Sequence, residues 1–337
     1  MIIIAVHIFV TSESNYQICV EKGLVAIPEV EGKKALVFDA LLSRLAAIKE
    51  NDFILMYIIG TKQLRGVWQA AGEAFYDETP VWPDRIYPFR CKIKCTKYNF
   101  VRALKLDDIN DLRASGKIWT WELERPGQRA SNSVFSISTY EYHILLTEYM
   151  KMNPFVSQTS VIPNPYPYHK ANIENHIHWY KGFPQYESSV MTLMNMAFSK
   201  GRFENIFGNY SDFLCYVPTN LRTEIDLLLM YENPLDSSQA ISYDIIEVKR
   251  DKFDENALKQ LIGYESWFLQ KKVSGDLNMV RTTAIAKSFS AEVVDYVKRR
   301  CEYENKPIKL LRYSCSEDGV LYLNYEDETL ERLISLT

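Results

Sequence analysis

Alternating apolar and polar positions predict short strands and helices over the first 150 residues. Strand-like runs lie at 2–10, 52–60, 65–76 and 87–95, and helix-like runs lie at 13–23 and 40–49. Short strands rich in β-branched and aromatic residues, mixed with short helices, are typical of a small mixed barrel. We therefore expect residues 1–150 to form an α+β domain built on a small β-barrel with helices.

The last third of the chain has the order of an α/β domain. Strand-like runs at 224–231 and 243–249 precede a helix-like run, and then come a strand at 280–286, a helix at 290–302 and a strand at 308–313. Strands that alternate with helices predict a central sheet with helices on its faces. We expect residues 186–337 to form this second domain, with a mixed central sheet.

Between the two domains, residues 151–185 are rich in proline, tyrosine and histidine. Prolines stand at 154, 163, 165, 167 and 184. Proline removes backbone donors and favours extended chain, whereas a flexible spacer would be rich in glycine and serine. The segment is predicted to be a linker or a surface arm that connects the domains semi-rigidly.

Composition limits the class of protein. The chain has 337 residues, 47% of them hydrophobic, and a net charge of −4, so it can bury a large core and is not strongly basic. The apolar opening is too short to span a bilayer and lacks the features of a signal peptide. The six cysteines show no zinc-type spacing and are expected to be reduced thiols. We expect a soluble, cytoplasmic protein without a membrane partner.

Three charged residues of the last third could form a catalytic site. Glu247 and Lys249 lie two apart on a strand-like run, so their side chains share a face, and Asp226 lies on the preceding run. Carboxylates are suitable ligands for Mg²⁺, with Mn²⁺ as an alternative, and we assign Asp226 and Glu247 to the metal. Lys249 could orient or deprotonate an attacking water, which indicates phosphodiester hydrolysis.

Two further residues distinguish this trio from an ordinary exposed ion pair. Gln260 and Tyr264 lie four apart on the following helix-like run, so both face the same way. The arrangement resembles the PD-(D/E)xK nuclease superfamily, in its RecB-like and NucS-like branch, over roughly residues 185–325. In that resemblance Gln260 and Tyr264 are the QxxxY signature. They are expected to orient Lys249 or a substrate phosphate.

The same resemblance implies one more acid, from a helix that precedes the aspartate strand. Glu187 is the candidate by position, and Glu224 is a weaker one. The proline that often precedes the aspartate in this superfamily is missing here. A histidine pair, His176 and His178, lacks a third ligand at a recognisable spacing and is not assigned to a metal.

The amino-terminal domain resembles the PUA-like superfamily, in particular EVE and YTH domains. The resemblance rests on a strand and helix that end in Gly23, a central hairpin around 52–77, and a tryptophan loop that leads into RCKIKC. It implies a reader of nucleic acid that encloses a modified base. Trp82 would then be the pocket tryptophan, with Asn15 and Tyr16 at the pocket edge. Packing of Trp82 in the core is an equal alternative.

A basic stripe lies on the strand after this loop. From 85 to 105 there are seven basic residues and no acidic one, and Arg90, Lys92 and Lys94 are expected on one face of the strand. The stripe is expected either to follow a phosphate backbone or to be an ordinary solvated surface.

Together these patterns predict a Mg²⁺-dependent endonuclease that cuts DNA, of the restriction or repair type, directed by the amino-terminal reader to a modified base or a DNA structure. Cutting both strands requires two active sites, so a homodimer is expected. The alternatives are a non-catalytic nucleic-acid-binding protein that uses the nuclease fold as a scaffold, and a nuclease directed to RNA.

Overall fold

The chain folds into two compact units, residues 2–177 and residues 178–337, and its architecture is α+β. The structure is a computed structural model that describes residues 4–29, 35–96, 100–121, 123, 133–155, 161–167, 169–219, 223–233, 235–316 and 319–326. The division falls between Ile177 and His178. Among the described residues, no helix combines the length and the apolar character needed to cross a membrane.

The amino-terminal unit is built on a mixed, curled sheet. Along the chain its elements are β1 (Val6–Thr11), α1 (Glu13–Lys22), β2 (Leu24–Ile27), α2 (Ala35–Leu45), β3 (Phe53–Ile58), β4 (Gln63–Ala70), β5 (Phe75–Tyr76), β6 (Phe89–Cys95), β7 (Leu104–Lys105), α3 (Leu106–Ala114), β8 (Val134–Ile137), α4 (Thr139–Met152) and a 3-10 turn, η1 (Ile173–His176). The strand order is β2-β6-β4-β3-β1-β8, with β5 beside β6 and β7 beside β4. Only the β1–β3 pair is parallel among the strand pairs of this described sheet.

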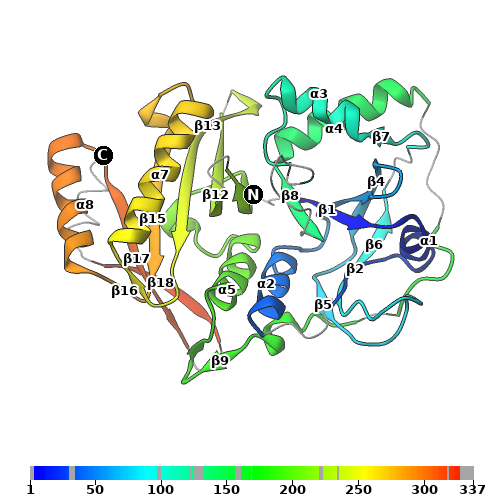
Figure 1. Cartoon of the computed structure of the whole chain (residues 1–337), viewed down its shortest axis with the longest axis horizontal. Helices are drawn as coiled ribbons and strands as arrows, with labels where there is room; N and C mark the ends of the chain where they lie inside the picture. The colour runs from blue at the N-terminus through cyan, green and yellow to red at the C-terminus, as the bar shows by residue number, and fades with distance from the viewer. Residues whose placement is uncertain are drawn as a thin grey trace. The chain divides into compact units, whose positions relative to one another are not determined.

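Local sequence explains where the helices of this unit begin and end. The Ser12 hydroxyl accepts the backbone N–H of Asn15 at the start of α1, and Gly23 ends the helix in the left-handed region with φ of 60°. Helices α3 and α4 lie together in Figure 1, and both pack on an apolar cluster centred on β1, β3, β4 and β8. Trp121, which is fully buried, lies in the same cluster.

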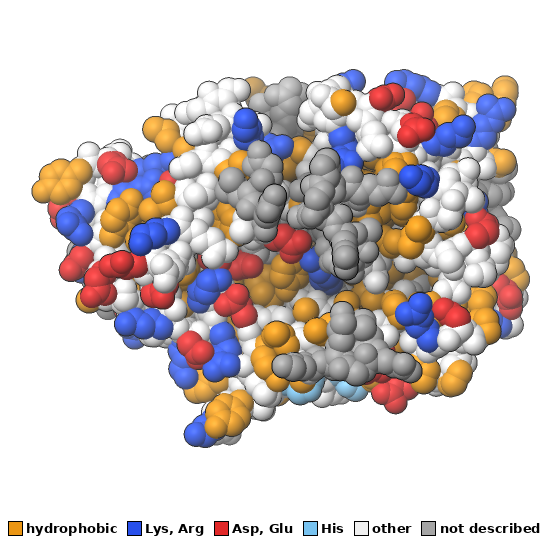
Figure 2. Space-filling model, in the orientation of Figure 1, with side chains coloured by type: hydrophobic (Ala, Val, Ile, Leu, Met, Phe, Trp, Pro, Cys, Tyr) orange, Lys and Arg blue, Asp and Glu red, His pale blue; other side chains and the backbone are white. Residues whose placement is uncertain are grey.

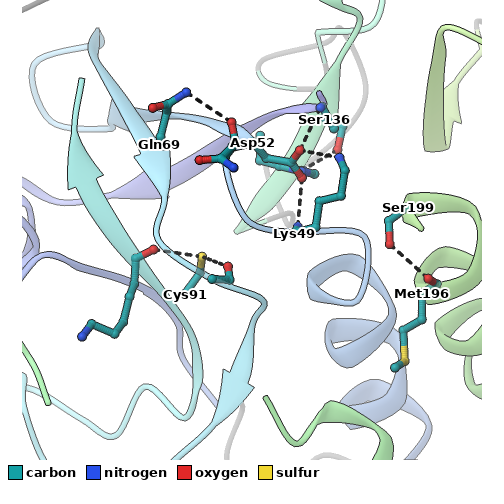
Figure 3. Close-up of polar contacts among 12 residues, drawn as sticks. Lys49, Asp52, Gln69, Cys91, Ser136, Met196 and Ser199 are labelled. Carbon is teal, nitrogen blue, oxygen red and sulfur yellow. Dashed lines mark hydrogen bonds and ion pairs between the residues drawn. The ribbon is translucent and has the colours of Figure 1, made fainter. Parts of the chain in front are cut away.

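A cluster of buried polar side chains joins β1, β8 and the turn before β3. The two ring nitrogens of His7 lie 2.9 Å from the Ser136 hydroxyl and 3.1 Å from the Asp52 carboxylate. Asp52 also accepts hydrogen bonds from the Lys49 ammonium, at 2.7 Å, and from the Ala5 N–H, at 2.9 Å. Figure 3 shows Lys49 and Asp52 pointing toward each other beside Ser136. Each buried side chain of this cluster therefore has hydrogen-bond partners, as burial requires.

The carboxy-terminal unit contains a second mixed sheet. Along the chain its elements are β9 (Trp179–Tyr180), β10 (Phe183–Pro184), α5 (Glu187–Ser199), α6 (Glu204–Phe207), β11 (Asp212–Pro218), β12 (Glu224–Asn233), β13 (Asp236–Val248), β14 (Lys252–Phe253), α7 (Glu255–Lys271), η2 (Leu277–Met279), β15 (Val280–Ala286), β16 (Ser288–Phe289), α8 (Ala291–Glu304), β17 (Ile308–Cys315) and β18 (Leu321–Tyr325). The sheet order is β11-β12-β13-β15-β17-β18. This confirms the predicted mixed sheet and its flanking helices.

Helix α7 connects two parallel strands and determines how this sheet is built. It links β13 to β15, and α8 links β15 to β17, so three neighbouring strands run parallel, while β11, β12 and β18 pair antiparallel. Such crossovers place helices on the sheet face, and α7 packs on β13 and β15 (Figure 1). Its start is capped by Asp254, whose carboxylate accepts two backbone N–H groups.

Candidate active site

The carboxy-terminal unit brings four predicted site residues into one cluster. Asp226 lies on β12, Glu247 near the end of β13, Lys249 one residue beyond it, and Glu187 at the first position of α5. The antiparallel register pairs Leu227 with Ile246, so its continuation by one residue places Asp226 opposite Glu247. Opposite residues of an antiparallel pair point to the same face. The sheet therefore sets the two carboxylates side by side.

Lys249 connects these acids. Its ammonium lies 2.6 Å from one carboxylate oxygen of Glu247 and 3.3 Å from one of Glu187. It also donates to the backbone carbonyl of Val248 at 3.2 Å. The Lys249 side chain is 23% exposed, whereas Glu247 is fully buried. Solvent therefore reaches the cluster through the Lys249 side chain and through Glu187, which is 44% exposed.

The two central carboxyl groups are held in an environment that resists their ionisation. Burial raises the pKa of Asp226 to about 7, although the nearby Lys249 charge and the Val248 N–H, 2.8 Å from the carboxylate, lower it. Burial and then the Asp226 charge raise the pKa of Glu247 to about 9. Near neutral pH the cluster therefore keeps a proton that ordinary carboxyl groups would release.

The environment favours the charged form of Lys249, whereas it disfavours the charged forms of the two acids. Burial acts to lower the pKa of its ammonium, but the charges of Glu247 and Asp226 outweigh burial and raise it. The side chain is therefore charged at neutral pH. A charged ammonium can donate hydrogen bonds but cannot accept a proton, so this state favours orienting a water over deprotonating it.

Gln260 and Tyr264 support the site from α7. Tyr264 is buried, and its hydroxyl donates to the backbone carbonyl of Glu224 at 2.7 Å. The Gln260 amide in turn donates to that hydroxyl at 2.7 Å. Glu224 lies two residues before Asp226 on β12, so the pair ties α7 to the strand that carries Asp226. Within the described residues, these hydrogen bonds run to β12 and not to Lys249.

One oxygen of the cluster lacks a partner. The second carboxylate oxygen of Glu247 is buried and has no hydrogen-bond partner among the described residues. A buried unsatisfied oxygen costs free energy, and such groups are often explained by a ligand, a water or an ion. No group of three His, Cys, Asp or Glu side chains in the described part of the chain has the geometry to hold a metal by itself.

The predicted amino-terminal site residues are less exposed than expected. Trp82 is 4% exposed and packs against Tyr87, with 4.9 Å between ring centroids. Asn15 is 8% exposed and donates to the Tyr87 hydroxyl at 2.6 Å. Of the two roles considered for Trp82, the structure therefore shows packing in the core.

The prediction that three basic side chains share an outer face of β6 is wrong for Arg90. Arg90 is fully buried, pairs with Asp77 at 3.0 Å and donates to the Tyr166 hydroxyl at 2.8 Å. Tyr166 belongs to the proline-rich segment, which covers this part of β6. Lys92 and Lys94 are partly exposed, and Lys94 donates to the side chain of Asn51 at 2.7 Å. Segments distant in sequence therefore decide which basic residue meets solvent.

The cysteines, His176 and the surface charges were the remaining features considered in the sequence. Cys91 is a buried free thiol, and Cys95 is partly exposed. Figure 3 shows Cys91, whose sulfur lies 3.4 Å from the Lys92 carbonyl. His176 packs on the ring of Tyr76, with 4.3 Å between centroids. Figure 2 shows acidic and basic side chains interspersed on the visible face, in agreement with a net charge of −4.

Comparisons with known proteins give remote similarities. No protein-family model matches the sequence. No curated protein matches it either. Among solved structures, a hypothetical protein from Leishmania major is similar with a TM-score of 0.33 and 15% identity, over 44% of this chain and 97% of that one. A protein from Pseudomonas putida has a TM-score of 0.29 and 15% identity, over 43% and 99%.

A third solved structure is similar over more of the chain. It is the complex of EndoMS with double-stranded DNA, with a TM-score of 0.25 and 14% identity, over 86% of this chain and 96% of that chain. The TM-scores and identities of all three similarities are low, and they assign no function to the chain.

Proposed function

We propose that the chain is a divalent-cation-dependent endonuclease that hydrolyses phosphodiester bonds in DNA. The observation that carries the proposal is the Asp226 and Glu247 pair beside the charged Lys249, with a buried Glu247 oxygen that has no partner in the described chain. The proposal extends the resemblance to the PD-(D/E)xK superfamily. An ordinary structural ion pair would not need a second, half-buried acid next to it.

The residues present fit a divalent cation. Burial raises the pKa values of both adjacent acids, and the Asp226 charge raises that of Glu247 further, so added positive charge would stabilise their ionised forms. Asp226 and Glu247 would hold Mg²⁺, or Mn²⁺ in its place, because hard cations prefer carboxylate oxygens. Such an ion supplies Lewis-acid stabilisation of phosphate charge and an acidic bound water. The unpartnered Glu247 oxygen supports this assignment.

The protein side chains have distinct tasks in this proposal. Lys249, charged and one quarter exposed, donates hydrogen bonds to the attacking water or to an anionic phosphate oxygen. Glu187 holds the Lys249 ammonium from the α5 side. In the net reaction the water oxygen bonds to phosphorus, one P–O ester bond breaks, and the alkoxide leaving group takes up a proton. Gln260 and Tyr264 are positioning residues, because they act through β12.

The amino-terminal unit supplies recognition in this proposal. The unit would select a modified base or a DNA structure and direct cutting nearby, in a restriction or repair role. A homodimer would provide the two active sites that cutting both strands requires. RNA is the competing substrate, so the assay below includes it.

Hydrolysis can be tested with the purified full chain. Plain duplex DNA, base-modified duplex DNA and RNA are incubated with Mg²⁺, with Mn²⁺ or with EDTA, and products are separated by electrophoresis. We expect cation-dependent DNA cleavage that falls at least about 100-fold in Lys249→Ala, because a positioned charge at the reacting phosphate is lost. Lys259→Ala, which removes an exposed lysine of α7, is the matched control and should cut normally.

Two outcomes would overturn the proposal. Equal cutting by the wild type and by Lys249→Ala would mean that the nuclease activity is not that of this site. The absence of cutting by the wild type on every substrate, together with unchanged melting on addition of Mg²⁺ or Mn²⁺, would leave a nucleic-acid-binding scaffold. Asp226→Asn tests cation binding directly. Titration of this variant with Mn²⁺ should detect no binding at the Asp226 and Glu247 pair.

A further inference from the structure

A hollow in the amino-terminal unit has the chemistry of a ligand site. Its volume is about 490 Å³, within the usual range for small-molecule sites. The lining comes from α1, β4, the segment before α3 and the end of α4. It includes Tyr16, Arg65, Trp68, Phe100, Arg102 and Lys105.

The floor of this hollow is aromatic. Trp68 is 9% exposed and Phe100 is 8% exposed, so both present only a small part of their rings. Tyr16 meets Trp68 edge to face, with 5.9 Å between ring centroids. Aromatic floors of this kind favour flat ligands, because ring faces and edges give contact area at little entropic cost.

One guanidinium of the hollow is held in place before any ligand arrives. The Arg65 guanidinium lies over the Tyr16 ring, 4.7 Å from its centroid. Its nitrogens donate to the Glu13 carboxylate at 2.8 Å and to the Gln63 side chain at 3.0 Å. A planar guanidinium restrained on three sides can stack on a base, as arginine does when proteins bind single-stranded nucleic acids.

The rim of the hollow is basic. Arg102 and Lys105 are both exposed at its edge. The described lining residues include no carboxylate; of the acids that contact them, Glu13 pairs with Arg65, and Asp108 accepts the backbone N–H of Lys105 at 3.0 Å. Two exposed cations beside aromatic side chains match a ligand in which an anion is attached to a planar ring. A nucleotide is the common biological ligand with both parts.

This hollow differs from the pocket that the sequence resemblance predicts. That pocket would be centred on Trp82, which is packed against Tyr87 and is 4% exposed. Trp68, by contrast, lies on β4 and reaches the hollow described above. Trp68, which the sequence resemblance does not assign to a pocket, thus borders this hollow, whereas Trp82 packs in the core.

We propose that the hollow lined by Tyr16, Arg65, Trp68, Arg102 and Lys105 binds a single unstacked nucleotide, with its base over the Tyr16 and Arg65 side and its phosphate between Arg102 and Lys105. The role of this nucleotide site in DNA recognition rests on the proposed function. Nucleotide binding itself does not depend on hydrolysis. Binding can therefore be measured without a divalent cation.

The test is calorimetric titration of the full chain in EDTA with dAMP, with deoxyadenosine and with ribose 5-phosphate. We expect dAMP to bind, and each of the other two to bind at least about 10-fold more weakly, because each lacks one half of the recognised group. Arg102→Gln combined with Lys105→Gln should weaken dAMP binding by about 10-fold or more and should lower its salt dependence. Arg65→Gln should weaken binding of the base as well.

Two control variants distinguish this site from others. Lys92→Gln removes a basic residue of a separate hollow in the same unit, and it should leave dAMP binding unchanged. Lys249→Ala should also leave it unchanged, whether or not the chain proves to be a nuclease. Melting curves of all variants report whether the fold is intact.

Several results would overturn the inference. One is failure of dAMP to bind at millimolar concentration. Another is equal binding of ribose 5-phosphate and dAMP, because that result would show a phosphate site that does not recognise the base. Loss of binding in Lys92→Gln or in Lys249→Ala, with the Arg102 and Lys105 double variant unaffected, would place the nucleotide elsewhere.

Discussion

Replacement of Glu247 by glutamine should change how the stability of the protein depends on pH. Glu247 is fully buried, and its pKa is raised from an ordinary value of 4.5 to about 9. Between these two values the folded protein holds a proton that the unfolded chain has released. The free energy of unfolding of the wild type therefore falls as the pH rises through this window. Glutamine has nearly the same shape and no proton to lose, so the variant lacks this part of the slope.

The size of the effect follows from the pKa shift. Each pH unit inside the window costs up to 1.36 kcal/mol for one retained proton, so a rise from about pH 5.5 to about pH 7.5 costs up to about 3 kcal/mol. Asp226 also has a raised pKa, and its charge is one cause of the Glu247 shift, so part of the retained proton belongs to Asp226 and stays in the variant. We therefore expect about 1–2 kcal/mol, which is about 3–6 °C in melting temperature for a unit of this size.

Differential scanning calorimetry at several pH values without divalent cation measures this slope. Added Mg²⁺ extends the assay, because a cation that binds the ionised acids should stabilise the wild type more at high pH than at low pH. Glu247→Gln should respond weakly to Mg²⁺. Glu302→Gln, which changes an exposed glutamate of α8, should behave as the wild type does. Parallel pH slopes for the wild type and Glu247→Gln, or equal stabilisation of both by Mg²⁺, would refute the reasoning.

Two further substitutions test the supporting contacts. Tyr264→Phe removes the hydroxyl that donates to the Glu224 carbonyl, so we expect a loss of about 1–2 kcal/mol in the free energy of unfolding, measured by denaturant titration. A stability within error of the wild type would show that this contact does not hold β12. Arg90→Leu leaves the Asp77 carboxylate without its main cation and should cost about 3 kcal/mol, whereas Arg85→Leu, at a 59% exposed arginine, should cost little. A normal melting temperature with weakened DNA binding in Arg90→Leu would contradict the buried role.

The carboxy-terminal unit could be predicted in detail because its signals are local. Glu247 and Lys249 are separated by the strand period, and Gln260 and Tyr264 by the helix period, so each pair shares a face once the element forms. The strand predicted at 280–286 is observed as β15 with the same bounds. Periodicity also predicted the helix–strand order that follows. The family resemblance implied a further acid, position in the chain suggested Glu187, and the structure places it 3.3 Å from Lys249.

The exposure of residues in the amino-terminal half could not be predicted in this way. Strand alternation puts Arg90, Lys92 and Lys94 on one face, but it does not say what covers that face. The Tyr166 hydroxyl, contributed by a segment 76 residues later in the chain, covers Arg90 and satisfies part of its charge. Burial depends on such long-range packing, which no local pattern records.

The sequence by itself determined the two-part α+β organisation, the strand and helix periods and the charged residues available for catalysis, because these depend on neighbours along the chain. Only the tertiary structure decided which tryptophan borders a hollow and which carboxylate oxygen lacks a partner. The sequence resemblance placed Trp82, and not Trp68, at the predicted pocket, whereas in the structure Trp68 borders the hollow and Trp82 packs in the core. Their surroundings differ because the segments that pack against each one, around Tyr16 and around Tyr87, meet it only when the chain is folded.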